Sequence, residues 1–450
     1  MLLSIADSLS IISVVTPILT MNRKDISLNL VYPKSRGYRL TSIGHFIMIK
    51  IFKAKSLVVS VLALSLFESS QAMSTSLTIG LYPYVPRQAQ FQSVLEASWA
   101  KLHPKVPLKF INNDKIWDGG YNTNPPPEAD VFVFDAIHFN YFKSKNLLER
   151  LKPYEIKNKK DFYSYAIQGV QSGKGFYGIP QLGCTDILFY DKKDKPLASS
   201  KTLTDVTKAL GKCNYVDEKP PKHRGLMIDM AGSTTDATLY LAAKYSLDHK
   251  YPLDLPSSSD ALNKPALNNL HSVLEASSYR NASIDEHPNA AWFNEGYGRA
   301  YVGFSESLSS LSAQKRKDID FKLMPLSDRK VKQPLFYSDV IGISPQTKIR
   351  KTRALALELA NLMASTRVMV ESTDRIVKNG KEEKPPQYLL PVRKSVLIKL
   401  AKHDSTYAHL KSLLDSANPL MFKINDKSKD WLDNMKKNIK KEVLKEPKCP

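Results

Sequence analysis

Apolar and polar residues along the chain follow patterns that predict strands alternating with helices. Leu77 to Leu81 is an apolar segment typical of a strand. Apolar residues then recur at helical spacing at Phe91, Val94, Leu95, Trp99 and Leu102. Further strands are predicted at residues 106–111 and 131–134, and the second of these is apolar at every position. Such a strand is covered on both faces, so the pattern predicts a parallel sheet in an α/β fold.

Beyond this sheet, the pattern predicts a second lobe inserted into the first. Residues 177–190 contain two extended segments with no helix between them, and residues 335–344 are extended again. Between these crossings lie helical segments at 234–245 and 265–279 and a strand at 300–304. Two lobes joined by crossings form a hinged clamshell with a central cleft, and this order of elements resembles type II periplasmic solute-binding proteins. We expect lobe one at residues 73–182 and 335–450 and lobe two at 183–334.

The N-terminal region reads as a secretion signal. Residues 48–72 combine a basic start, a short apolar run and small residues before Ala72, which is the pattern of a signal peptide cleaved there. The apolar run is shorter than the roughly 20 residues of a membrane span, so a membrane anchor is the weaker interpretation. Residues 1–47 precede a complete signal peptide and read as an upstream extension. We therefore expect a secreted or periplasmic protein without a stable membrane anchor.

Composition and charge narrow the class of protein. The chain has 450 residues, 42% of them hydrophobic and 24% charged, as in an ordinary globular protein. Its formal charge of +21 raises the possibility of a nucleic-acid partner. However, the densest basic run, Lys427 to Lys445, alternates with acidic residues, which favours a solvated helix face over a nucleic-acid arm. We expect no nucleic-acid partner.

Several common catalytic and nucleotide-binding motifs do not occur in the sequence. It contains no GxxxxGK[ST], HExxH or CxxC motif, so we expect neither a metal site nor a nucleotide cofactor. The segment Gly303 to Ser307 approaches the GxSxG motif of serine hydrolases, but a serine replaces its last glycine. A serine hydrolase is therefore a weak candidate.

Cys184 is the most interesting of the three cysteines because it lies at the first predicted crossing between the lobes. A thiol in this position could act as a nucleophile if a base removed its proton, since the thiolate is the reactive form. Two alternatives stay open: Cys184 could be a buried structural cysteine, or it could form a disulfide with Cys213.

Other cleft candidates flank the predicted strand ends. Asp135 closes the apolar strand at 131–134, where open parallel sheets bind ligands, although a loop aspartate or helix cap would give the same pattern. Aromatic residues gather at such positions and would suit a flat heteroaromatic ligand, or would simply belong to the core: Tyr82, Tyr84, Tyr121, Trp292, Phe304 and Tyr337.

Several longer segments together resemble one enzyme family. They are residues 81–86, 130–135, 177–185, 230–235, 298–307, 334–340 and 386–391. Across residues 77–435 the chain resembles bacterial thiaminase I, the thiamine pyridinylase family of clamshell enzymes. The resemblance implies a transferase that displaces the thiazole of thiamine with a small amine or thiol through a covalent cysteine–pyrimidine intermediate. It implies no metal or organic cofactor, and we expect a monomer.

The resemblance also assigns roles to individual residues. Cys184 falls on the nucleophile of the family and Glu306 on its general acid and base. Asp135 and Asp339 fall on the aspartates that hold the pyrimidine. The cleft tyrosines of the family fall on Tyr82, Tyr121 and Tyr337, and Phe304 stands where the family pattern has a tyrosine. With Tyr84, which the aromatic pattern adds, these would be the substrate-binding aromatic residues. The rival hypothesis is a thiamine-type periplasmic solute-binding protein without chemistry, which would have no use for a thiol beside a carboxylate.

Overall fold

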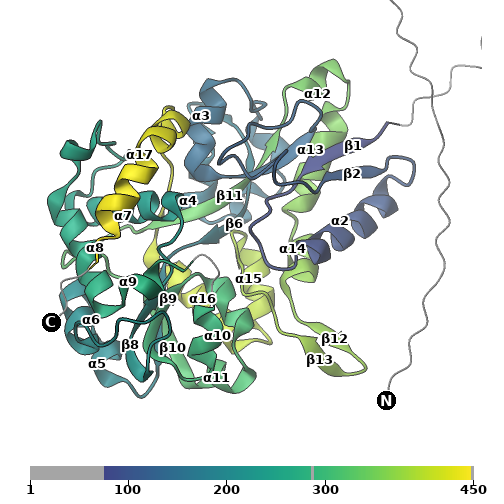
Figure 1. Cartoon of the computed structure of the whole chain (residues 1–450). Helices are drawn as coiled ribbons and strands as arrows, with labels where there is room; N and C mark the ends of the chain where they lie inside the picture. The colour runs from purple at the N-terminus through teal and green to yellow at the C-terminus, as the bar shows by residue number, and fades with distance from the viewer. Residues whose placement is uncertain (1–74, 285–287, 447–450) are drawn as a thin grey trace, which may run out of the picture. The chain divides into compact units, whose positions relative to one another are not determined.

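The computed structural model describes residues 75–284 and 288–446. The predicted extension at 1–47 and signal peptide at 48–72, together with Cys449, lie outside these residues. Within the described residues, most strands fall into two sheets, and two short hairpins complete the set (Figure 1). No helix of the described residues is long and apolar enough to cross a membrane. The fold is mixed α/β, as predicted.

The larger sheet contains seven of the described strands in the order β14-β6-β11-β3-β1-β2, with β15 paired to β11. Their bounds are β1 Leu77–Gly80, β2 Leu108–Ile111, β3 Val131–Asp135, β6 Ile179–Cys184, β11 Leu335–Ile343, β14 Leu390–Pro391 and β15 Leu420–Met421. The strands β2, β1 and β3 are parallel to one another, as predicted. However, β11 lies between β3 and β6 and runs antiparallel to both, so the sheet is mixed.

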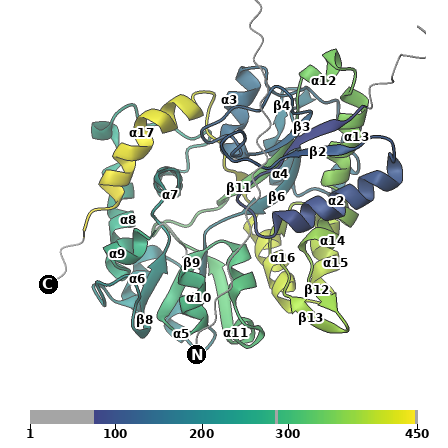
Figure 2. The same cartoon turned by 45° about the vertical axis from the view of Figure 1, so that its right-hand side comes forward.

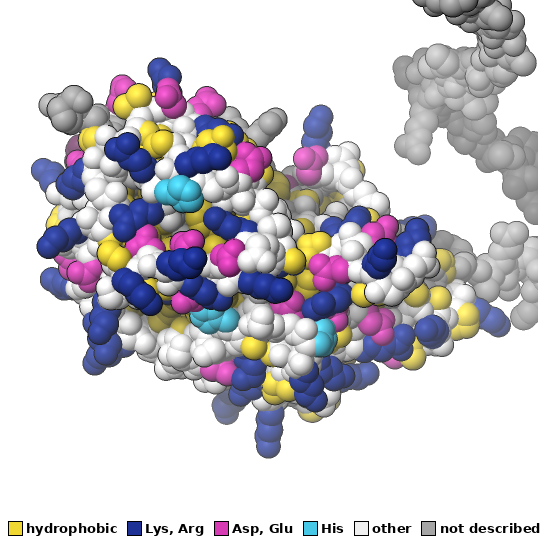
Figure 3. Space-filling view, turned by 90° about the horizontal axis from the view of Figure 1, so that it is seen from below, with side chains coloured by type: hydrophobic (Ala, Val, Ile, Leu, Met, Phe, Trp, Pro, Cys, Tyr) yellow, Lys and Arg dark blue, Asp and Glu magenta, His cyan; other side chains and the backbone are white. Residues whose placement is uncertain are grey.

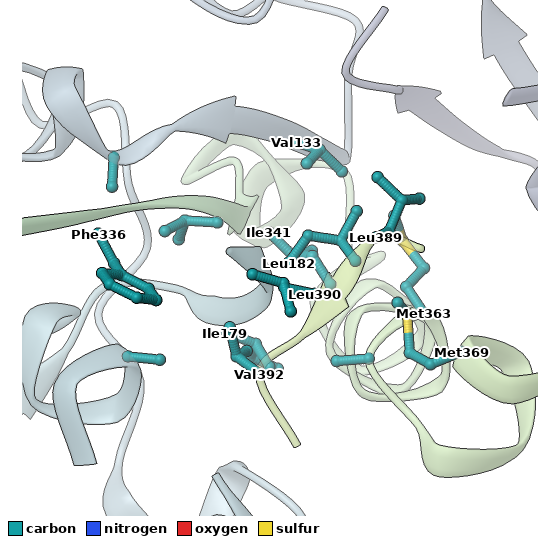
Figure 4. Packing of buried hydrophobic residues seen from close by; sticks show 14 of the residues in the cluster. Val133, Ile179, Leu182, Phe336, Ile341, Met363, Met369, Leu389, Leu390 and Val392 are labelled. Carbon is teal, nitrogen blue, oxygen red and sulfur yellow. The ribbon is translucent and has the colours of Figure 1, made fainter. Parts of the chain in front are cut away.

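Apolar side chains from this sheet pack under helices from later in the chain. Figure 4 shows Leu182 of β6, Ile341 of β11 and Leu389 close together, with Met363 and Met369 beside them. The helices around this sheet are α2 Gln88–Leu102, α3 Phe139–Ser144, α4 Ser164–Gly169, α12 Gln346–Ile349, α13 Arg353–Met363, α14 Thr366–Thr373, α15 Lys394–Ala401 and α16 Ser405–Ala417. This core holds the ends of β3, β6 and β11 in fixed positions.

The smaller sheet has the order β10-β7-β9-β8. Its strands are β7 Ile187–Asp191, β8 Lys222–Ile228, β9 Gly298–Gly303 and β10 Ile319–Leu323. The helices in this part of the chain are α5 Lys195–Ser199, α6 Leu203–Leu210, α7 Ser233–Asp248, α8 Lys264–Ala276, α9 Tyr279–Ala282, α10 Asn289–Asn294 and α11 Ala313–Asp318. Only Thr185 and Asp186 separate β6 of the large sheet from β7 of the small one. The predicted crossing at 177–190 therefore joins the two sheets.

The remaining described elements are short hairpins, short 3₁₀ helices and one long C-terminal helix. The hairpins pair β4 Gln171–Ser172 with β5 Gly175–Phe176 and β12 Ile376–Lys378 with β13 Lys381–Lys384. The short 3₁₀ helices are η1 Ala136–His138, η2 Pro153–Glu155, η3 Lys159–Asp161, η4 Ser259–Ala261 and η5 Ser305–Ser310. The last helix, α17 Ser428–Val443, packs against α7 and α8, and Figure 2 shows it in yellow beside them. The exact lobe boundaries stay a prediction.

The basic residues lie at the surface, where acidic residues accompany them. As predicted, the run after Lys427 forms a helix, α17, whose buried stripe includes Trp431, Met435 and Ile439 while Lys437 and Lys441 are exposed. Figure 3 shows Lys and Arg side chains spread over one face of the molecule with Asp and Glu among them. This distribution matches a solvated surface rather than a concentrated anion-binding patch.

Candidate active site

Three neighbouring strands of the large sheet bring a thiol, a phenol and two carboxylates together. Cys184 ends β6, and its partner across the sheet is Tyr337 of β11. Two residues further along β11, Asp339 lies opposite Asp135, the last residue of β3. Tyr337 and Asp339 point to the same face because side chains alternate along a strand. Residues from three distant parts of the sequence thus share one end of the sheet.

Glu306 reaches the same region from the small sheet. Strand β9 ends at Gly303, whose partner across the sheet is Ile187, at the start of β7 and only three residues after Cys184. The chain then turns through Phe304 into η5, which contains Glu306. The charge of Glu306 acts on both Cys184 and Asp339, because each of their pKa values is raised by it. The structure therefore brings together Cys184, Glu306, Asp135 and Asp339, as the resemblance implied.

A chain of hydrogen bonds fixes Asp135. The Tyr82 and Tyr121 hydroxyls lie 2.9 Å apart, and the Tyr121 hydroxyl donates to Oδ2 of Asp135 over 2.7 Å. The other oxygen of Asp135 accepts from the backbone N–H of Ile137 over 2.9 Å, so Asp135 also caps η1. Asp135 is therefore a helix cap, one of the interpretations that the sequence offered, and its role as a cleft residue stays a prediction.

Aromatic rings form a second part of the site. Tyr337 stacks on Phe422, with ring centroids 4.8 Å apart and planes inclined by 19°. Phe304 meets the edge of the Tyr337 ring at 6.1 Å. Tyr84 is exposed and contacts the rings of Tyr82 at 5.5 Å and of Tyr121 at 5.7 Å.

Trp292, the sixth aromatic residue that the sequence singled out, lies elsewhere. It belongs to α10, and the ammonium group of Lys219 lies 5.7 Å from its ring centroid. None of its described ring contacts joins the aromatic residues around Cys184.

The carboxylates of the site have unusual acidities because they are enclosed and close together. Burial raises the pKa of Asp135 to about 6 and that of Glu306 to about 7. Burial also raises the pKa of Asp339 well above its usual range, and the charges of Asp135 and Glu306 raise it further. Among the described residues, none of these three carboxylates forms an ion pair with a Lys, Arg or His. Within the part of the chain that the structure describes, these carboxylates are therefore not neutralised by a cationic side chain.

The thiol of Cys184 is free and protonated in this environment. Burial raises its pKa well above the usual value, and the charges of Glu306, Asp339, Asp135 and Asp186 add to the rise. Cys213 is disulfide-bonded, and since Cys184 is free, the possible bridge between the two does not form. Cys184 is also partly accessible to solvent, unlike a sealed structural cysteine.

Sequence reasoning missed two residues of this site, Asp186 and Phe422. The charge of Asp186 raises the pKa of both Cys184 and Tyr337. The sequence could have predicted Asp186 as a site residue. It is two residues after Cys184, and residues two apart on an extended chain face the same side. Phe422 carried no such signal, because its place under Tyr337 depends on the pairing of β15 with β11. In the described residues, no group of three or more His, Cys, Asp or Glu is arranged to hold a metal ion.

Comparisons with known proteins find similarity of both sequence and fold. Residues 185–327 match the thiaminase-1 domain. Thiaminase-1 of Paenibacillus thiaminolyticus is 31% identical over 375 residues, covering 82% of this chain and 88% of that protein. The structure of Clostridium botulinum thiaminase I in complex with thiamin matches with a TM-score of 0.76 and 32% identity, covering 82% of this chain and 100% of the other.

A more distant match defines the fold class. The GacH receptor of Streptomyces glaucescens, whose structures include a complex with acarbose, matches with a TM-score of 0.57 over 83% of this chain and 97% of its own. At 14% identity this likeness concerns the fold alone. It confirms the predicted α/β fold of the periplasmic-binding-protein type.

Proposed function

Because this chain belongs to the thiaminase-1 family, we propose that it is a thiamine-degrading transferase, a thiamine pyridinylase, with Cys184 as its nucleophile. One observation carries the proposal: a free thiol lies among the enclosed carboxylates Glu306, Asp339 and Asp135, and these have no cationic partner among the described residues. In a protein with a formal charge of +21, such a site suits a small cation. Thiamine is a permanent cation, and the C. botulinum relative was solved with thiamin bound.

The raised pKa values of Cys184 and of the carboxyl groups near it favour a mechanism in which the substrate itself activates the thiol. In the empty cleft the thiol keeps its proton, because a thiolate there would be buried among negative charges. Entry of the thiazolium cation opposes this effect and lowers the pKa of the thiol. Glu306, with a pKa of about 7, then accepts the thiol proton near neutral pH.

The reaction then proceeds by covalent catalysis. The Cys184 thiolate adds to a carbon of the pyrimidine ring and forms a C–S bond. The electron pair pushed into the ring expels the thiazole: the bond from the methylene carbon to the thiazolium nitrogen breaks, and the nitrogen keeps the pair and becomes neutral. An amine or thiol attacks the methylene carbon and loses a proton to the base. The C–S bond to Cys184 then breaks, which restores the pyrimidine ring.

The large sheet supplies the groups that hold the pyrimidine. Asp135 and Asp339 lie opposite each other on neighbouring strands, so they can bind the amino group and a ring nitrogen side by side. With its raised pKa, the pair readily shares a proton, and this favours a protonated or imino pyrimidine that accepts electron density. The rings of Tyr82, Tyr84, Tyr121, Phe304 and Tyr337 supply flat surfaces for the heterocycle.

The proposal includes the wider properties expected from the sequence. The enzyme acts as a monomer without metal or organic cofactor, with one lobe at 73–182 and 335–450 and the other at 183–334. A leader at residues 48–72 directs it to the periplasm or the exterior. The co-substrate is a small amine or thiol that enters the same cleft.

A product assay tests the function directly. Purified protein is incubated with thiamine and pyridine, and the pyridine adduct of the pyrimidine and the free thiazole are identified by mass. We expect both products in equal amounts from the wild type, and a rate lower by roughly 10³-fold or more from Cys184→Ser, because serine is a far weaker nucleophile. Binding of thiamine without either product would instead identify a solute-binding protein.

A further inference from the structure

Asp186 is an acidic residue next to the site in the sequence, and it has no role in the chemistry described above. It lies two residues after Cys184, between β6 and β7, and is partly enclosed. Residues two apart on an extended chain face the same side, so its carboxylate is expected on the side of Cys184. In agreement with this, its charge raises the pKa of Cys184 and of Tyr337. Among the described residues it forms no ion pair and no hydrogen bond with another side chain. An enclosed carboxylate in this situation is available to a ligand.

The position of Asp186 separates it from the aspartates that hold the pyrimidine. Asp135 and Asp339 belong to the large sheet. Asp186 instead precedes β7 of the small sheet, whose first residue, Ile187, lies opposite Gly303 at the end of β9. Asp229, which follows β8 at the same edge, raises the pKa of Asp186 through its charge. A substrate whose pyrimidine is held by Asp135 and Asp339 would have this edge of the small sheet available for its other end.

That other end of thiamine has a chemistry that a lone carboxylate can recognise. The thiazolium ring is positively charged but has no N–H group, so hydrogen bonding cannot identify it. Recognition must come from ring contacts and from opposite charge at close range in an enclosed site. This need differs from that of the pyrimidine edge, which offers hydrogen-bond donors and acceptors to Asp135 and Asp339.

We propose that Asp186 is the residue that selects the cationic thiazolium end of the substrate; this inference rests on the proposed thiaminase function. The thiazole becomes neutral as it leaves, so attraction to Asp186 is strongest in the bound ground state and fades toward the transition state. Asp186 therefore contributes to affinity and not to the chemical step. Its negative charge even opposes ionisation of Cys184. Loss of this charge is expected to raise KM without lowering kcat.

The test compares thiamine with 3-deazathiamine, a neutral analogue in which carbon replaces the charged ring nitrogen. Dissociation constants for both ligands are measured by calorimetry at pH 8, where Asp186, with a pKa of about 6, is ionised. For Asp186→Asn we expect the Kd and KM for thiamine to rise by about 10- to 100-fold, the range for one charge pair in a partly enclosed site. The affinity for 3-deazathiamine stays within about threefold of the wild type, and kcat does not fall.

Matched variants separate this role from a structural one. Asp191→Asn removes a carboxylate from the exposed far end of β7, and it is expected to leave both affinities and kcat unchanged. Asp186→Glu keeps the charge and is expected to restore the preference for thiamine. If Asp186→Asn is poorly folded by circular dichroism, Asp186→Ser replaces it.

The possible outcomes are decisive in either direction. Equal losses of affinity for the charged and the neutral ligand, no loss for either, or a lower kcat at unchanged KM each overturn the role of Asp186. Failure of the proposed function gives a different result, because the wild type then binds thiamine but forms no product. The dissociation constants for thiamine and 3-deazathiamine still decide whether Asp186 distinguishes the charged ligand from the neutral one. A wild type that binds neither ligand refutes both proposals.

Discussion

Replacing Glu306 with glutamine is the sharpest test of the catalytic assignment. Glu306→Gln preserves the size of the side chain and removes only the ability to accept a proton at this position. The side chain is partly enclosed in η5, and among the described residues its one hydrogen bond to another side chain is a long one from Ser305, at 3.5 Å. The substitution therefore breaks no structural network, and the fold is expected to survive it.

The expected effects on rate and on binding differ in size. Loss of a general base lowers the rate by about 10²- to 10⁴-fold, which corresponds to about 2.7–5.5 kcal/mol in the activation barrier. Loss of one charge near a bound cation costs less: at an effective dielectric constant of about 20 and a separation of about 8 Å, the attraction is about 2 kcal/mol. That is a factor of about 30 in Kd. The loss in kcat is thus expected to exceed the loss in affinity.

The pH dependence gives a second, independent signature. Glu306 must be unprotonated to accept the thiol proton, and burial raises its pKa to about 7. The value of kcat/KM for the wild type is therefore expected to fall as pH decreases through about 7, while Glu306→Gln loses this dependence. Asp135 and Asp339 titrate in the same enclosed site, so the observed midpoint belongs to the coupled group rather than to Glu306 alone.

Rates with thiamine and pyridine, measured from pH 5 to pH 9, and affinities from calorimetry supply both quantities. The matched control is Glu295→Gln, which removes a carboxylate from the exposed end of α10, where it pairs with Lys219 at 3.4 Å. This control should match the wild type in rate, affinity and pH profile. A Glu306→Gln variant with nearly wild-type kcat and an intact acidic limb would refute the reasoning and place the base elsewhere.

Two further predictions concern the oxidation state of the cysteines and the effect of the buried carboxyl group of Asp339 on the stability of the fold. Alkylation of the unreduced protein followed by peptide mapping should label Cys184 and leave Cys213 unlabelled until a reductant is added; labelling in the reverse order would exclude Cys184 as a free nucleophile. Asp339→Asn should raise the melting temperature at pH 8 but much less at pH 4, because the raised pKa of Asp339 means that its stability contribution is lost as pH rises through that pKa. The gain is about 1.4 kcal/mol for each pKa unit relieved, and equal melting temperatures of variant and wild type at pH 8 would contradict it.

Much of the fold followed from the spacing of apolar residues, because burial dictates that spacing locally. The first strands, α2 and the crossing at 177–190 were predicted close to their observed bounds. The antiparallel course of β11 between β3 and β6 was not, since strand order depends on contacts between residues about 200 positions apart. Likewise, the apolar stripe of α17 predicted a helix but did not indicate that α7 and α8 would cover it.

The sequence predicted a residue of the site only where the position of that residue relative to the predicted strands was itself informative. Cys184 could be recognised from its place at a crossing, and Asp135 from its place after an apolar strand. Asp339 was named from family resemblance alone, and its position opposite Asp135 depends on the register of β11. The pKa shifts of the site residues could not be predicted from the sequence, because they arise from burial and from neighbours that only the folded chain brings together.

The combination of a protonated thiol and an acidic cleft has a consequence for selectivity. A cysteine that is ionised in the free protein would react with oxidants and with neutral electrophiles. Here burial and the surrounding carboxylates raise the pKa of Cys184. Under the mechanism proposed above, the thiol ionises when a positive charge enters, so binding and activation are linked through the same electrostatic interaction. A substrate without a cationic ring would bind next to a nucleophile that it cannot activate. In that mechanism, the carboxylates at the end of β3, within β11 and in η5 after β9 make the chemistry depend on the charge of the ligand.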